Sequence, residues 1–145
     1  MPGTQMGKST EGAKDPTLLV LMLVYGAASL LHFAHNALYL HDYPNLPAWL
    51  TSTGVAASWL VVAATGALGY LLYSRVSGMA GALTITLYAL FGCGGLEHYT
   101  VAPMSAHTAG MNVTILLESA TAVVLIGYVA RAVFLPTAAR PRDRR

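Results

Sequence analysis

Four long apolar segments alternate with short polar turns along the chain. They cover residues 17–40, 48–73, 79–99 and 105–133. An α-helix of about 20 residues crosses a bilayer core of about 30 Å, so each segment is long enough to span a membrane. The turns carry the Pro, Gly, Asn and Ser residues that end helices. The pattern predicts an all-α integral membrane four-helix bundle, connected up-down-up-down, over residues 17–135.

Composition favours the same class of protein. Hydrophobic residues make up 55% of the 145 positions and charged residues only 10%, whereas a soluble domain carries about 25% charged residues. Charges gather in 1–16 and 136–145, which we interpret as a flexible N-terminal tail and a basic C-terminal tail. We expect the basic tail to contact lipid headgroups and not nucleic acid. The single cysteine, Cys93, excludes an intrachain disulfide.

The distribution of Lys and Arg predicts the orientation. Lys8 and Lys14 precede the first segment, Arg75 separates the second from the third, and arginines follow the fourth. Loops 41–47 and 100–104 contain neither residue type. By the positive-inside rule both termini are cytoplasmic and these two loops face outward. We expect a multi-pass protein of the bacterial inner membrane.

Five histidines fall in the outer half or the outer loops of this topology: His32, His35, His41, His98 and His107. Glu97 and Asp42 join them there, and Glu118 lies near the middle of the membrane. An ionisable group costs a few kcal/mol in hydrocarbon even on lenient scales, so such residues usually have partners and often a task. We interpret His41 as a solvated loop residue, and the other four histidines with Glu97 and Glu118 as a candidate site.

Helix geometry predicts a deeper layer in this site. His107 and Glu118 are eleven residues apart, which places them on nearly the same helix face and about 16 Å apart in depth. His32 lies about 13 Å below the outer end of its segment, near the depth of Glu118. We expect His32 and Glu118 to form a pair, with Asn112 nearby.

An upper layer combines His35, His98 and His107, with Glu97 as a fourth ligand or a hydrogen-bond acceptor. Imidazoles and carboxylates suit Zn²⁺, Cu²⁺ or non-haem Fe²⁺. The leading hypothesis is therefore an outward transition-metal site, with the deeper pair as further ligands, for redox chemistry or metal handling. Catalysis would need an open coordination position and a substrate path, and the sequence shows neither.

Three alternatives stay open. Haem b ligated by His35 with His98 or His107 would make the chain an electron-transfer subunit. The same polar residues would equally form a hydrogen-bonded core in a non-catalytic accessory subunit of a larger membrane complex, or in a homo-oligomer. Glu118, near the middle of the membrane, would also serve a proton or cation transporter.

Overall fold

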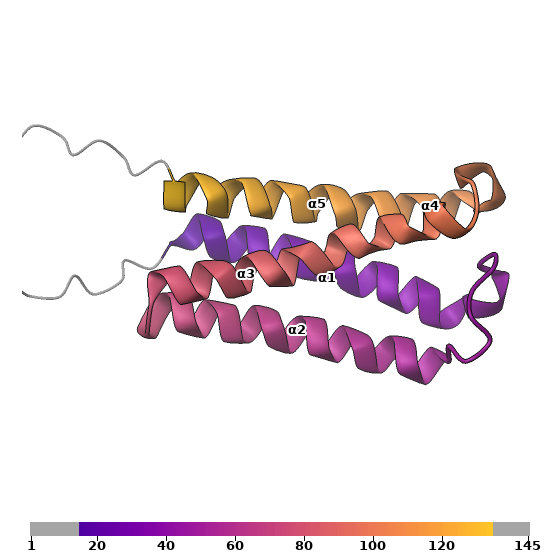
Figure 1. Cartoon of the computed structure of the whole chain (residues 1–145), viewed down its shortest axis with the longest axis horizontal. Coiled ribbons are helices and arrows are strands. Elements are labelled where there is room, and N and C mark those ends of the chain that lie inside the picture. The colour runs from indigo at the N-terminus through magenta and orange to yellow at the C-terminus, as the bar shows by residue number, and fades with distance from the viewer. Residues whose placement is uncertain (1–14, 135–145) are drawn as a thin grey trace, which may run out of the picture.

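The computed structural model describes residues 15–134, and the regular elements in this range are helices. The long helices are α1 (Pro16–Leu38), α2 (Ser52–Arg75), α3 (Gly78–Cys93) and α5 (Ala109–Phe134), shown in Figure 1. Four short helices complete the fold: η1 (Leu40–Asp42), η2 (Gly94–Glu97), α4 (His98–Val101) and η3 (Met104–Ala106). The predicted tails, 1–16 and 136–145, lie outside the described residues apart from Asp15 and Pro16.

Within residues 15–134, four helices are long and apolar enough to cross a membrane. They are Pro16–Leu38, Ser52–Arg75, Gly78–Val101 and Ala109–Val133, and the third joins α3, η2 and α4 into one continuous span. Successive spans run in opposite directions, so their connections alternate between the two ends of the bundle (Figure 1). The prediction of an all-α chain with four such segments is confirmed.

Two helices, α2 and α5, begin later in the chain than predicted. The hydroxyl of Thr51 accepts a hydrogen bond from the Gly54 amide at 3.0 Å, so α2 begins at Ser52 and not at residue 48. The fourth span was expected to start near Ser105, but the chain forms the turn η3 there and α5 begins at Ala109. Both differences lengthen the loops at one end of the bundle.

The outer surface of the bundle is apolar, and polar side chains lie inside. Leu23 and Leu60 each expose 63% of their surface, and Val61 exposes 62%. The buried polar residues are Ser29, His32, Asn36, His107, Thr114, Glu118 and Ser119. Apolar surface of this extent would promote aggregation in water, whereas a lipid bilayer solvates it. The arrangement fits an integral membrane protein.

Small residues bring the helices into close contact in the apolar half of the core. The rings of Tyr25 and Tyr88 pack edge to face with centroids 4.6 Å apart, and a Cβ at Gly66 would lie 2.9 Å from the Tyr88 ring. A Cβ at Gly81 would overlap the backbone of Tyr73, so α2 and α3 touch main chain to main chain.

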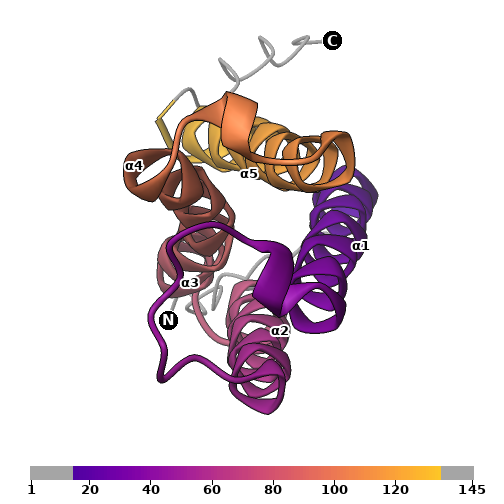
Figure 2. The same ribbon diagram turned by 90° about the vertical axis from the view of Figure 1, so that its right-hand side faces the viewer.

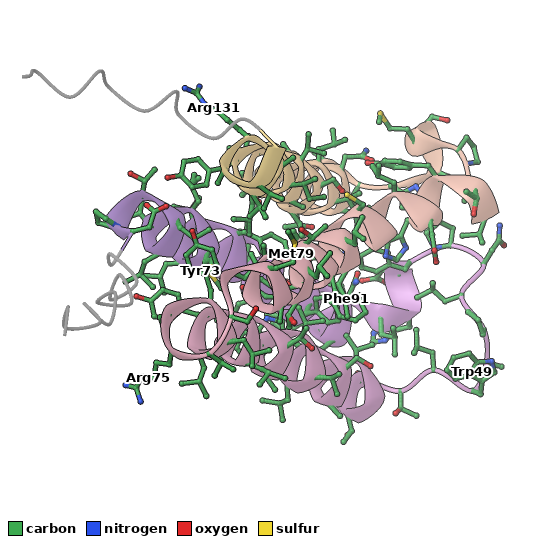
Figure 3. All side chains as sticks on the ribbon, turned by 60° about the vertical axis from the view of Figure 1, so that its left-hand side comes forward. Trp49, Tyr73, Arg75, Met79, Phe91 and Arg131 are labelled. Atoms are coloured by element: carbon green, nitrogen blue, oxygen red, sulfur yellow. The ribbon has the colours of Figure 1, made fainter. Side chains whose placement is uncertain are left out.

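The two ends of the bundle differ in chemistry. Arg75 and Arg131 lie at one end, which we call the arginine end, and Trp49 lies at the other (Figure 3). The loops 39–51 and 102–108 connect helices at the Trp49 end, which faces the viewer in Figure 2. We call it the histidine end, because His32, His35, His98 and His107 gather there.

Close contact at Gly81 gives a direct test of the packing. Gly81→Ala should destabilise the protein by about 1–3 kcal/mol, because the new methyl group pushes against the Tyr73 backbone, which cannot turn aside as a side chain can. Gly78→Ala on the same helix is the control. A Cβ at Gly78 meets no atom within 4 Å, so its effect should stay within about 0.5 kcal/mol. Unfolding in detergent, followed by circular dichroism, measures both; equal stabilities would contradict the α2–α3 contact.

Candidate functional site

Four histidines gather at the histidine end, and they come from three separate segments. His32 and His35 lie on the last turns of α1, His98 begins α4, and His107 directly follows η3. The ring centroids of His32 and His98 are 5.5 Å apart, and those of His98 and His107 are 6.1 Å apart. These three imidazoles form a column that leads from the end of the bundle into its core.

The inner end of the column meets Glu118. His32 is 2% exposed and Glu118 is 1% exposed. The His32 Nε2 atom lies 3.7 Å from Glu118 Oε2, which is longer than a hydrogen bond. Both carboxyl oxygens are buried and lack a hydrogen-bond partner among the described residues. A Cβ at Gly95, on η2, would lie 3.4 Å from Glu118 Oε2 and 3.7 Å from His32 Nε2, so this glycine borders the pair.

Asn36 connects His32 to the outer histidines. Its side-chain nitrogen lies 3.0 Å from His32 Nε2 and 3.5 Å from His98 Nε2. An amide NH₂ group can only donate, so with this amide orientation both imidazole nitrogens accept. The His32 proton then sits on Nδ1, which is 3.4 Å from the Thr114 hydroxyl oxygen. That hydroxyl gives its own proton to the Met111 carbonyl at 3.0 Å and is free to accept.

Tyr43 occupies the middle of the upper histidines. Its ring centroid lies 5.8 Å from that of His35, 5.0 Å from that of His98 and 6.4 Å from that of His107. The phenol oxygen is 2.9 Å from His35 Nδ1. Burial disfavours the phenolate and raises the pKa of Tyr43 to about 12. A neutral phenol therefore fills the space that the three imidazoles surround.

His107 has one ring nitrogen fixed and the other free. Its Nδ1 lies 3.1 Å from the Pro103 carbonyl oxygen. A carbonyl only accepts, so Nδ1 carries the proton and Nε2 keeps its lone pair. This Nε2 is buried and has no hydrogen-bond partner among residues 15–134. Metal-binding histidines are commonly held in this way, with one nitrogen bonded to a carbonyl and the other directed at the ion.

Other residues considered from the sequence lie elsewhere. Glu97 and His41 are exposed. Asn112, which was expected near the deeper pair, instead lies at the outer loop: its oxygen accepts from the Tyr99 hydroxyl at 2.8 Å, and its nitrogen donates to the Met104 carbonyl at 3.2 Å. Thr114, two residues further along α5, lies next to His32 in the place where Asn112 was expected.

Sequence reasoning missed the parts played by Asn36, Tyr43 and Gly95. Asn36 had a readable signal, because it follows His32 by four residues and so shares its helix face. Gly95 belongs to a glycine-rich run that indicates close approach but not its partner. Tyr43 stands in a loop, where no periodicity predicts a direction, and only the folded chain shows its position.

Within residues 15–134, no group of three or more His, Cys, Asp and Glu side chains could hold a metal ion in the observed positions. No protein-family model matches the chain, and comparisons with curated proteins and with solved structures gave no match either. Function is therefore inferred from the contacts of the site itself.

The buried phenol of Tyr43 should make the protein less stable in alkaline solution. The pKa of Tyr43 is about 12 in the folded chain, against 10.0 for a free tyrosine. Its contribution is intact below the lower value and is lost as the pH rises through the higher one, because the unfolded chain releases this proton first. The loss should reach about 2–3 kcal/mol. Tyr43→Phe should flatten the decline, as measured by unfolding titrations between about pH 9 and pH 12.

Tyr39→Phe is the matched control, because Tyr39 is 49% exposed. It should keep the wild-type dependence on pH. A Tyr43→Phe protein that declines as steeply as the wild type would show that the Tyr43 phenol is not buried in the folded chain.

Proposed function

We propose that this membrane protein binds a transition-metal ion through the imidazoles at its histidine end. The observation that carries the proposal is the state of His107. Its Nδ1–H is held by the Pro103 carbonyl, and its Nε2 lone pair is buried without a partner. A buried acceptor that lacks a partner is costly, and a bound cation would offset that cost.

His98 is the second ligand of the proposed site. Two imidazoles on one ion bring their ring centroids about 5–6 Å apart, since each nitrogen lies about 2.0–2.1 Å from the metal. The centroids of His98 and His107 are 6.1 Å apart. We leave His32 outside the set, because its Nε2 borders Glu118 and lies 3.0 Å from the Asn36 nitrogen, whereas the contact of Asn36 with His98 Nε2 is longer, at 3.5 Å.

His35 completes the set once Tyr43 turns aside. The phenol lies between His35 and the other two rings, and it is hydrogen-bonded to His35 Nδ1. Ion binding then exchanges one hydrogen bond for a coordination bond, and it displaces Tyr43 from its buried position. Because Tyr43 is neutral, no charge has to leave with it.

Neutral nitrogen donors favour Zn²⁺, Cu²⁺ or Fe²⁺ over Mg²⁺ or Ca²⁺. Thioether ligands, which would select Cu(I), lack support here. Met104 is 48% exposed, and the Met111 sulfur accepts a hydrogen bond from the Thr108 amide at 3.4 Å. Haem is less favoured than a bare ion, because the Tyr43 and Tyr99 rings pack against the imidazoles where a porphyrin would have to lie.

We further propose that the histidine end faces outward and the arginine end faces the cytoplasm. Arg75 and Arg131 lie at one end of the bundle, whereas the loops 41–47 and 100–104 at the other end contain no Lys or Arg. This distribution supports the orientation by the positive-inside rule. A metal site in this orientation would exchange ions with the exterior.

Metal analysis of the purified full-length protein tests the proposed ligands. After incubation with Zn²⁺, Cu²⁺ or Fe²⁺ and removal of free ions, the wild type should retain the preferred ion, and His107→Ala should lose affinity by at least about tenfold. His41→Ala, in an exposed loop position, should bind like the wild type. A Soret band would select haem instead. Metal-free protein that co-purifies with other membrane proteins would contradict the proposal and favour an accessory subunit.

Cysteine labelling tests the orientation. In a Cys93→Ala background, Trp49→Cys and Val76→Cys place one thiol at each end of the bundle, at positions 78% and 73% exposed. A membrane-impermeant maleimide added to intact cells should modify Trp49→Cys, and it should modify Val76→Cys only after lysis. The reverse result would place the arginine end outside and overturn the outward site.

A further inference from the structure

Glu118 is a buried acid with no partner of opposite charge. It lies on α5 in the core, and within the described residues the only basic group inside 4.0 Å of its carboxyl oxygens is the His32 imidazole. Neither oxygen accepts a hydrogen bond from the part of the chain that the structure describes, and the Ser29 hydroxyl, on the His32 face of α1, is also buried and without a partner there. An ionised carboxylate in these surroundings would be strongly disfavoured.

The tautomer of His32 decides where a proton can lie. Its Nε2 accepts from the Asn36 amide, and its proton is on Nδ1, directed at Thr114. The nitrogen that borders Glu118 therefore presents a lone pair and not an N–H group. Two lone pairs 3.7 Å apart repel each other unless one of the atoms carries a proton. The available position for that proton is the carboxyl group.

We propose that Glu118 is a proton-binding site inside the membrane-spanning bundle, neutral in the resting state and able to exchange its proton with His32. Transfer moves the proton from a carboxyl oxygen to His32 Nε2 and breaks the hydrogen bond that Nε2 accepts from the Asn36 amide. It leaves a carboxylate beside an imidazolium; return transfer restores the neutral pair and the hydrogen bond. The site does not depend on the proposed metal ligands His35, His98 and His107, so either proposal can fail without the other.

The other groups around Glu118 are hydroxyls and a thiol, which carry no positive charge that could stabilise a carboxylate. The Tyr25 hydroxyl donates to the Tyr88 carbonyl at 3.0 Å, and the Tyr88 hydroxyl donates to the Met22 carbonyl at 3.4 Å. The Cys93 thiol packs against the same apolar cluster. On α5 itself, the Ser119 hydroxyl donates to the Gly92 carbonyl at 3.0 Å. None of these groups provides a positive charge to the carboxyl group.

Gly95 borders the gap between Glu118 and His32 that the proton would cross. A Cβ at this position would lie 3.4 Å from Glu118 Oε2, and 3.7 Å from both His32 Nε2 and Ser119 Oγ. These three polar atoms are partners of the kind that hold a bridging water. The gap of 3.7 Å between acid and base is long for direct transfer, so a small side-chain rotation or such a bridge must close it.

Infrared spectroscopy of the full-length protein in lipid nanodiscs tests the protonation state. At neutral pH the wild type should show the C=O stretch of a carboxylic acid, Glu118→Gln should lack it, and Glu97→Gln, at an exposed position, should keep it. An acid band that survives in Glu118→Gln, or no such band in the wild type, would overturn the proposal.

Deuterium exchange tests the transfer between Glu118 and His32, and chemical labelling tests the protonation of Glu118 a second time. In D₂O the acid band shifts as the proton exchanges. This exchange should be at least about tenfold slower in Gly95→Ala, because the methyl group occupies the position beside both atoms that a bridging water would take. Gly94→Ala, whose Cβ meets no atom within 4 Å, should exchange like the wild type; equal rates in both variants would overturn the exchange with His32.

If Glu118→Gln does not fold, hydrophobic carbodiimide labelling of the wild type replaces it. Modification should fall on Glu118, and labelling of Glu97 alone would contradict the proposal.

Discussion

A single constraint shapes the interior of this bundle: buried polar groups must satisfy one another, because the surrounding surface is apolar. On α1, Ser29, His32 and Asn36 repeat at spacings of three and four residues, which places them on one helix face. On α5, Thr114 and Glu118 do the same. The two polar faces meet inside the bundle, and this meeting fixes the rotation of α1 and α5 about their axes.

The same constraint sets the proton positions along the histidine column. The Pro103 carbonyl holds Nδ1–H of His107, and the Thr114 hydroxyl and the Asn36 amide together fix the tautomer of His32. In both rings Nε2 is then the nitrogen that can accept. Within residues 15–134, the buried side-chain atoms without a hydrogen-bond partner belong to Ser29, Asn36, His107 and Glu118, and we single out His107 Nε2 and the Glu118 carboxyl group. They are the places at which a cation and a proton, respectively, would complete the structure.

The sequence predicts the helical skeleton well, because length and hydropathy alone determine whether a segment can span a bilayer. The pairing of His32 with Glu118 followed from counting helical rise inward from each loop, and the two residues do lie 3.7 Å apart. Helical rise cannot be used to place a residue that lies in a loop. Tyr43 follows η1, and its insertion among the histidines depends on the path of the whole connection 39–51 (Figure 2). The placement of Asn112 was wrong because it precedes Glu118 by six residues, which puts it on another face of α5, where it bonds the loop carbonyl of Met104.

The histidine column brings three imidazoles from separate segments together inside one bundle, and the proposed metal site is built at its outer end. Solid-state NMR of the full-length protein in lipid bilayers, with ¹³C- and ¹⁵N-labelled histidine, measures this directly through correlations between rings. The expected spectrum links His98 to His32 and to His107, whose centroids lie 5.5 Å and 6.1 Å away, and it shows Nε2 of His32 and His107 without a proton. A His98 ring that correlates with neither neighbour would contradict the arrangement on which the site is built.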